Sequence, residues 1–112
     1  MTNEELNTRL YEKMFAEQER FRDWLLSQPP AEILNHAYEY SVREDIILAT
    51  EEMNLTPAQV RALLNSPAPL ADVYKDFSKL ETDYMSIVAQ CVEDRADDLL
   101  KEEQQQLSLI HI

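Results

Sequence analysis

The hydrophobic residues of the chain recur at helical spacing along most of its length. The longest regular pattern lies in the second half, where seven residues follow one another at alternating spacings of three and four. They are Leu70, Val73, Phe77, Leu80, Tyr84, Ile87 and Cys91. This spacing puts all of them on one side of a helix, and neither Pro nor Gly interrupts the chain from 70 to 104. The pattern predicts one long helix over about 69–104, whose buried side organises the rest of the fold.

Shorter helices are predicted in the first two-thirds of the chain, where capping signals mark their starts. A capping box pairs a Ser or Thr with a Glu or Gln three residues later. Such pairs are Thr2 with Glu5, Ser41 with Glu44, and Thr56 with Gln59. Prolines at positions 29, 30, 57 and 69 mark further ends and starts. The predicted helices cover about 3–28, 31–40, 42–53, 57–65 and 69–104.

The opening helix has an apolar side and a charged side. Its apolar side is marked by Leu6, Leu10, Met14, Phe21 and Leu25. Charged residues, Glu17 among them, are expected on the opposite side in contact with water. Together the predicted helices indicate an all-α fold, a four- to five-helix bundle built around the long C-terminal helix.

The chain length of 112 residues fits a single domain, predicted over 1–106. A helix over 69–104 would span roughly 54 Å, whereas a compact domain of this size has a radius of gyration of about 13 Å. The C-terminal third is therefore expected to protrude, to pack on a second copy of the chain, or to fray. Residues 107–112 interrupt the polar composition before them and resemble the translation of a sequencing adapter. We expect this segment to be a non-native or disordered tail.

The residue composition argues against catalysis and against bound cofactors or metals. The chain contains no Gly, which excludes loops that cradle phosphates and turns that bind dinucleotides. One Cys and two His are too few for a zinc site. His36 lies between Glu32 and Glu39, but this group completes neither a nucleophile triad nor a paired-carboxylate metal site. We expect no enzyme, no cofactor and no metal, and no stretch predicts a signal peptide or a membrane span.

The charge of the chain is strongly negative, with 22 acidic and 10 basic residues and a net charge of −12. Binding of nucleic acid through phosphate neutralisation needs clustered Lys and Arg, so direct nucleic-acid binding is not expected. The charge favours a basic protein partner, although it also serves plain solubility. The candidate contact surfaces are the acidic segments 39–52, with interleaved tyrosine, and 93–103. The candidate partner-binding residues are Glu39, Tyr40, Glu44, Asp45, Glu51, Glu52, Glu93, Asp94, Asp97 and Asp98.

Three stretches resemble a family of small acidic helical proteins encoded on mobile elements of gut bacteria. They are LSQPPAEILNHAYEYSVREDI (26–46), LTPAQVRALLNSPAPLADVYKDF (55–77) and, more loosely, the opening helix. The resemblance covers most of residues 5–90 and carries no established activity, so no functional residue is transferred from it. It implies a setting in the cytoplasm of a bacterial host, among plasmids, conjugative elements or phages.

In size and charge the chain also resembles anti-CRISPR proteins. Many of these present carboxylates where a nuclease expects DNA phosphates, and a Cas9-type effector holds nucleic acid in a basic channel. The expected function is stoichiometric inhibition of a Cas nuclease, with a Cas9-type effector favoured, by competition for a basic surface. The alternative is a non-enzymatic accessory interaction module of a mobile element, which could be a homodimer formed through the long helix.

Overall fold

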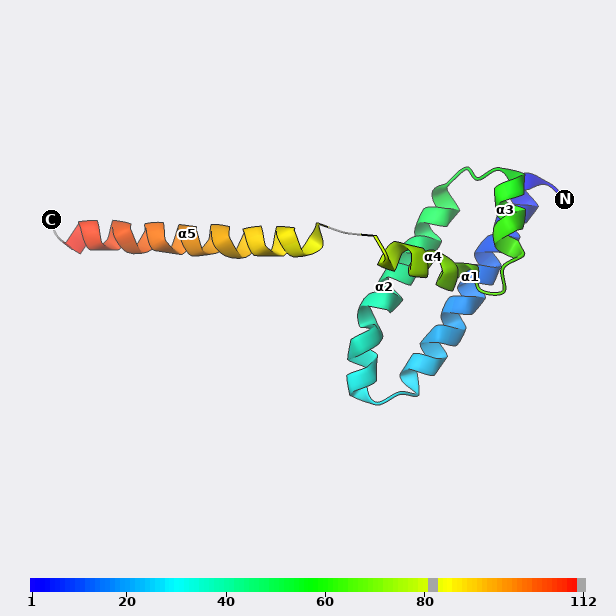
Figure 1. Ribbon diagram of the computed structural model, residues 1–112, viewed down its shortest axis with the longest axis horizontal. Coiled ribbons are helices and arrows are strands. Elements are labelled where there is room, and N and C mark those ends of the chain that lie inside the picture. The colour runs from blue at the N-terminus through cyan, green and yellow to red at the C-terminus, as the bar shows by residue number, and fades with distance from the viewer. Residues whose placement is uncertain (81–82, 111–112) are drawn as a thin grey trace. The chain divides into compact units, whose positions relative to one another are not determined.

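The protein is all-α over the residues that the structure describes. The computed structural model describes the backbone of residues 1–80 and 83–110, and the side chains of these residues up to 108. The described helices are α1 (Asn3–Leu26), α2 (Pro30–Glu52), α3 (Pro57–Leu64), α4 (Pro69–Ser78) and α5 (Tyr84–Ile110) (Figure 1). The predicted all-α class and the long C-terminal helix are confirmed.

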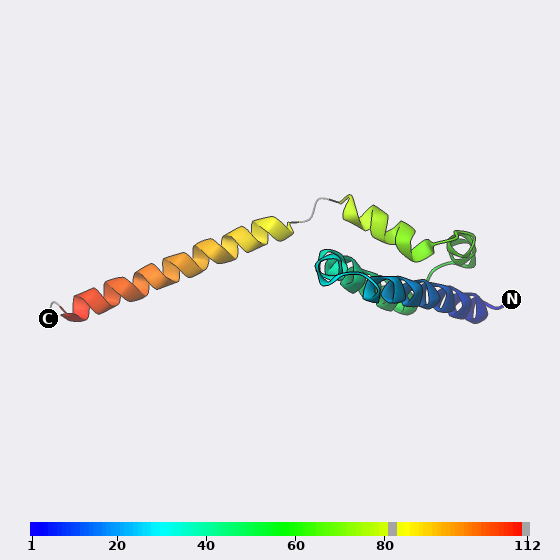
Figure 2. The same ribbon diagram turned by 90° about the horizontal axis from the view of Figure 1, so that it is seen from below.

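The chain divides into two compact units, Met1–Lys79 and Leu80–Ile112. The first unit contains α1 to α4 and the second contains α5. Within the first unit, α1 and α2 lie side by side and run in opposite directions (Figure 1). Figure 2 shows α3 and α4 on one face of this pair. The helix that all others of the first unit contact is α1.

The core of the first unit is apolar and receives residues from every helix of that unit. The buried cluster consists of Leu6, Leu10, Met14, Ile47, Val60 and Leu70. Half of these belong to α1, on the apolar side that the sequence pattern predicts. Burial of such side chains contributes about 1.5–3 kcal/mol each before conformational entropy is subtracted, so α1 is the main source of core stability.

Two of the predicted capping boxes act as helix starts. The hydroxyl of Thr2 accepts a hydrogen bond from the backbone N–H of Glu5 at 3.1 Å, which caps α1. At α3 the box is reciprocal: Thr56 Oγ1 accepts from the N–H of Gln59 at 3.2 Å, and Gln59 Oε1 accepts from the N–H of Thr56 at 2.9 Å. These bonds satisfy donors that have no partner inside the helix.

The predicted break of the second helical segment at 41–44 is wrong. α2 is one continuous helix from Pro30 to Glu52, so the boundaries at 40 and 42 do not exist. The residues that face inward here include the half-buried Tyr40, the buried Arg43 and the buried Ile47, at helical spacings of three and four. The apolar pattern is interrupted in the sequence because Arg43, a charged residue, occupies a core position.

The prediction of one unbroken helix over 69–104 is also wrong. α4 ends at Ser78, and Lys79, Leu80 and Asp83 are not helical; positions 81–82 of that prediction lie outside the described residues. The hydroxyl of Ser78 donates to the carbonyl of Lys75 at 2.8 Å, a local bond that competes with continuation of a helix. The predicted stripe is therefore divided between α4 and α5, and Leu80 lies in neither helix.

The two parts of that stripe have different environments. Leu70 is buried, and Val73 and Phe77 are partly buried, in the first unit. The side chains of the remaining members are exposed, namely Leu80, Tyr84, Ile87 and Cys91. Because α5 is the only described helix of the second unit, its apolar residues have no partner helix within that unit.

The end of α5 reaches into the segment predicted as a tail. Residues 107–110, expected to be non-native or disordered, are helical, and positions 111–112 of that prediction lie outside the described residues. Among the described helices, none is both long enough and apolar enough to cross a lipid bilayer.

Candidate functional site

A buried charge cluster joins α1, α2 and α4 around the guanidinium of Arg43. Its Nε and Nη2 atoms lie 2.9 and 2.8 Å from Oε2 of Glu39, one helical turn earlier in α2. Its Nη1 lies 3.9 Å from Oε2 of Glu17 in α1. The guanidinium carbon stands 4.2 Å above the ring centre of Phe21, within cation–π range. The cluster thus places one cation between two carboxylates and an aromatic ring.

Glu17 has a second role, at the start of α4. Its two carboxylate oxygens accept the backbone N–H groups of Leu70, at 2.9 Å, and Ala71, at 2.8 Å. The residue at the N-cap position of α4 is Ala68, whose side chain cannot accept a hydrogen bond. The carboxylate from α1 therefore does the work of an N-cap, and its negative charge suits the positive end of the helix dipole.

The expectation that Glu17 lies on the solvent-facing side of α1 is wrong. It is 7% exposed, and its neighbour Gln18 is 2% exposed. Gln18 Nε2 donates to the carbonyl of Tyr40, at 3.1 Å, and to Oε1 of Glu44, at 3.0 Å. Gln18 Oε1 is buried and has no hydrogen-bond partner within the described residues. Polar side chains thus continue the core side of α1 after Met14.

Aromatic rings cover the other end of the α1–α2 pair. The ring centres of Trp24 and His36 are 5.3 Å apart in an edge-to-face arrangement, and Phe21 stacks on Tyr40 at 6.4 Å. The imidazole nitrogens of His36 lie within 3.7 Å of Glu32 and 3.5 Å of Glu39. Among the described residues, no group of three or more His, Cys, Asp and Glu side chains is placed to hold a metal ion.

Two tyrosine hydroxyls in this part of the first unit have a raised pKa. Burial raises the pKa of Tyr40 above its ordinary value of 10.0, and the Glu44 carboxylate raises it further. Burial likewise raises the pKa of Tyr74 in α4, with an added contribution from Glu39. In both cases the environment disfavours the phenolate, because it is desolvated and faces negative charge.

The candidate residues of the first acidic segment divide into a group that contacts other residues of the first unit and a group that does not. Glu39, Tyr40 and Glu44 are engaged with groups in the first unit: Glu39 with Arg43, Tyr40 with Phe21, and Glu44 with Gln18. The other three candidates, Asp45, Glu51 and Glu52, are exposed and form no ion pair within the described residues. The structure thus separates carboxylates that organise the fold from carboxylates that face solvent.

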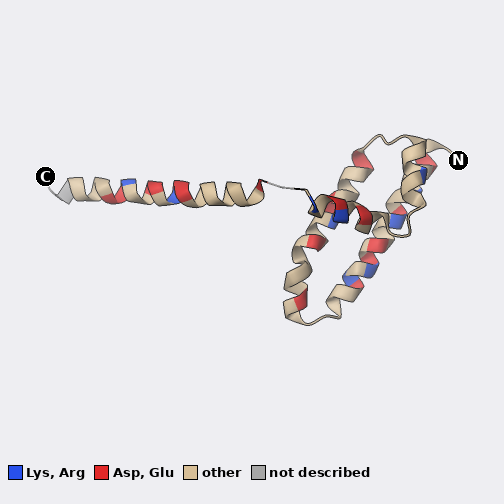
Figure 3. Ribbon diagram, in the orientation of Figure 1, with Lys and Arg blue, Asp and Glu red and all other residues tan. Residues whose placement is uncertain are grey.

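The candidates of the second acidic segment all lie exposed on α5, where Figure 3 shows the Asp and Glu positions in red. They are Glu93, Asp94, Asp97 and Asp98. At 100° per residue these four cover an arc of roughly 140° around the helix. Asp94 accepts a hydrogen bond from Gln90 at 2.9 Å, and all ion pairs within the described residues belong to the first unit.

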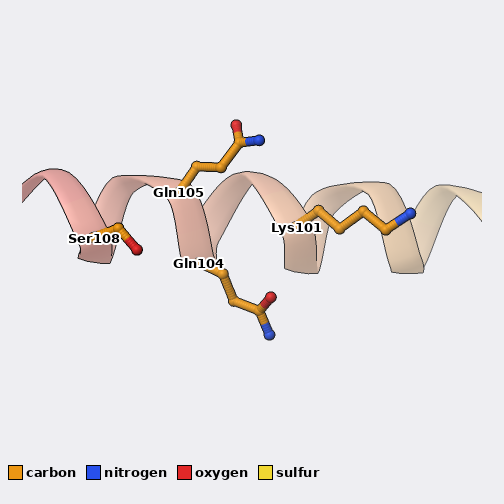
Figure 4. Close-up of a pocket in the computed structure, with 4 residues that line it drawn as sticks. All are labelled: Lys101, Gln104, Gln105 and Ser108. Carbon is orange, nitrogen blue, oxygen red and sulfur yellow. The ribbon is translucent and has the colours of Figure 1, made fainter.

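A hollow near the end of α5 is not a binding site. It is lined by Lys101, Gln104, Gln105 and Ser108, which belong to one helix. Figure 4 shows Gln104 and Gln105 extending to opposite sides of the helix, so their side chains do not converge on a shared space. Without a second element to close it, this hollow is open surface.

Sequence reasoning missed the roles of Glu17, Gln18 and Arg43. A signal for them exists: Glu17 and Gln18 follow Met14 by three and four residues, and Arg43 follows Glu39 by four. Polar residues that continue an apolar helical face predict a buried polar cluster when their charges complement each other.

Comparison with known proteins finds one family whose model matches the chain. A family model described as "Protein of unknown function (DUF3848)" matches residues 6–100, which includes all of α2, α3 and α4 and most of α1 and α5. Neither a curated protein nor a solved structure matches the chain.

Proposed function

The chain belongs to the DUF3848 family, and since that family's description assigns no activity, we propose a function from the chain's own surface. In this proposal the chain is a non-enzymatic protein that binds to a basic surface of a partner protein, where the partner normally binds nucleic acid. In its specific form the partner is a Cas nuclease, with a Cas9-type effector favoured. The chain would then be a stoichiometric inhibitor of the anti-CRISPR kind, acting in the cytoplasm of a bacterium that carries the mobile element.

The observation that carries the proposal is that carboxylates of both acidic segments are exposed and form no ion pair within the described residues. They are Asp45, Glu51 and Glu52 of α2 and Glu93, Asp94, Asp97 and Asp98 of α5, and further exposed acidic residues on α1 and α4 add to the negative charge. With a net charge of −12, the chain is expected to be steered toward positively charged surfaces. Those surfaces normally hold nucleic acid, so occupation by a protein would exclude the substrate.

The arrangement of the carboxylates also suits binding at low entropic cost. Those of α2 project from a helix that is held by the buried cluster around Arg43, so the backbone that carries them is ordered before binding. Pre-organised groups lose less conformational freedom when a complex forms. A fold with no Gly adds to this, since Gly increases the freedom of the unbound chain.

The test is a binding and competition experiment with the full-length chain. Tagged protein is mixed with a purified Cas9-type nuclease, with and without guide RNA, and bound nuclease is measured over about 0.05 to 0.5 M salt. We expect stoichiometric capture that weakens steeply with salt and is displaced by target DNA. If the amount of captured nuclease changes neither with salt nor with added target DNA, the charge-based proposal is refuted.

Matched variants make the test specific to the surface. The change Glu51→Gln with Glu52→Gln removes two exposed charges from the C-terminal end of α2. The control, Glu19→Gln with Asp23→Asn, removes two exposed charges that lie four residues apart on α1. We expect the α2 variant to lose affinity and the α1 control to retain it, whereas equal losses would indicate that only net charge matters.

A second candidate function is an accessory interaction module that assembles through α5. It is favoured by the exposed apolar side chains of that helix, which include Met85, Val88 and Val92. Self-association would have to overcome repulsion between the acidic residues at 93–98, which lie near the middle of the helix. Light scattering tests this assembly, since a monomer mass that does not change with concentration would exclude the homodimer.

A further inference from the structure

A shallow groove on the first unit lies between α2 and the C-terminal end of α4. Its lining includes Tyr38, Val42, Ile46 and Ala49 of α2 and Phe77 of α4, and its volume is about 350 Å³. This volume is near the lower limit of about 300 Å³ for small-molecule pockets. The groove is therefore suited to a single long side chain.

One charged residue, Asp45, takes part in this lining, whose other polar residue besides Tyr38 is Ser41. Within the residues that the structure describes, Asp45 has neither an ion pair nor a side-chain hydrogen bond. Arg43 does not neutralise the charge of Asp45, because residues two apart point to different sides of a helix. The Arg43 guanidinium pairs with Glu39 instead. Asp45 thus provides a free negative charge beside an apolar surface.

Exposed apolar residues continue this side of α2 on both sides of the groove. Leu34 is 77% exposed, Tyr38 60% and Leu48 59%. Leu34 precedes Tyr38 by four residues and Leu48 follows Asp45 by three, so they share one side of the helix. Large exposed apolar and aromatic residues around a charged group are the composition of a protein-binding surface.

We propose that this groove receives an arginine side chain from the basic partner, a proposal that rests on the proposed function and names the contact it uses. The methylene groups of the arginine would lie on Val42 and Ala49, and its guanidinium would stack on the Tyr38 ring. The guanidinium N–H groups would donate to the Asp45 carboxylate.

Arginine fits this groove better than lysine does. Its guanidinium is planar, is more weakly hydrated than an ammonium group, and can stack on a ring while it donates two parallel hydrogen bonds. An ammonium group would have to give up strong hydration to enter a largely apolar groove. Partners rich in arginine are therefore expected to bind more tightly than lysine-rich partners of equal charge.

The test uses ¹⁵N-labelled full-length protein and three short peptides with blocked ends. The peptides are identical except for one central residue, which is arginine, lysine or citrulline. We expect the arginine peptide to shift the backbone amide signals of residues 38–49 and Phe77, with an affinity at least about threefold above that of lysine. Citrulline keeps the shape but lacks the charge, so it should not produce these shifts.

Two variants and a control assign the effect to the groove. Asp45→Asn should weaken the arginine peptide about tenfold, the loss expected for a charge-assisted hydrogen bond. Ala49→Trp should fill the groove and abolish binding. Asp23→Asn, which removes one exposed charge from α1 outside the groove lining, should change the affinity less than about twofold.

The outcomes separate this inference from the proposed function. Equal binding of the arginine and lysine peptides, or binding that Asp45→Asn leaves unchanged, would overturn the arginine site. If a Cas nuclease nevertheless binds in a salt-dependent way, the proposed function stands without this contact. If the peptide binds as expected but no nuclease does, the groove stands and the proposed partner is wrong.

Discussion

Replacement of Glu17 by alanine is the sharpest test of how the first unit is held together. The change removes a buried carboxylate that accepts the N–H groups of Leu70 and Ala71 and stands 3.9 Å from Arg43. A hydrogen bond to a charged group contributes about 1.5–3 kcal/mol, and the loss leaves two amide groups without their acceptor. We therefore expect Glu17→Ala to lower the free energy of unfolding by about 3–5 kcal/mol.

The assay is urea unfolding followed by the fluorescence of Trp24. This residue is the only Trp of the chain and lies in α1, so its signal reports on the first unit and is not affected by the helix content of α5. With a slope of about 1–2 kcal/mol per molar urea for a small domain, the midpoint should fall by about 1.5 M or more.

Two further variants define the mechanism. Glu17→Gln keeps the side-chain volume and one acceptor oxygen, so we expect a smaller loss than for alanine. Glu19→Ala, at an exposed position of the same helix, should stay within about 0.5 kcal/mol of the original chain. A Glu17→Ala midpoint equal to that of Glu19→Ala would refute the view that a carboxylate from α1 caps α4.

Three other predictions concern the same unit. Arg43→Ala leaves the carboxylate of Glu39 without its cation, and we expect a loss of about 3 kcal/mol in the same urea assay; an unchanged midpoint would contradict this. The folded state raises the pKa of Tyr40 and Tyr74. The contribution of these two hydroxyls to the free energy of unfolding is therefore complete below pH of about 10 and is lost as the pH rises further. Replacement of both by Phe should therefore flatten the fall of stability between pH of about 9 and 11, as measured by urea midpoints; an equally steep fall would count against it. Thr56→Ala removes a reciprocal cap and should cost about 1 kcal/mol, whereas Thr8→Ala, at an exposed position inside α1, is the matched control.

The sequence was sufficient to predict the elements whose signals are local. The starts of α1 and α3 follow from Thr2 and Thr56, because a capping box involves only four neighbouring residues. The apolar side of α1 follows from its spacing. These features need no information about which helix packs against which.

Features that depend on packing between helices could not be predicted in the same way. The continuity of α2 depends on Arg43, whose burial becomes favourable only when Glu39, Glu17 and Phe21 surround it. The end of α4 at Ser78 was hidden by an apolar spacing that continues across the boundary of the two units.

The candidate site was predicted at the level of segments, while the roles of individual residues were not. The sequence identifies 39–52 as acidic, but it does not show which side of α2 faces α1. That orientation separates Glu39 and Glu44, which contact other residues of the first unit, from Asp45, which lines the groove.

The two hydrogen bonds between Glu17 and the start of α4 connect residues that are far apart in the sequence, with separations of 53 and 54 positions. During synthesis α1 leaves the ribosome first, so the Glu17 carboxylate is made well before the two N–H groups that it accepts. The native N-terminus of α4 therefore forms late, and a nascent chain that stops at α3 contains Glu17 and Arg43 but lacks the amide groups of residues 70–71.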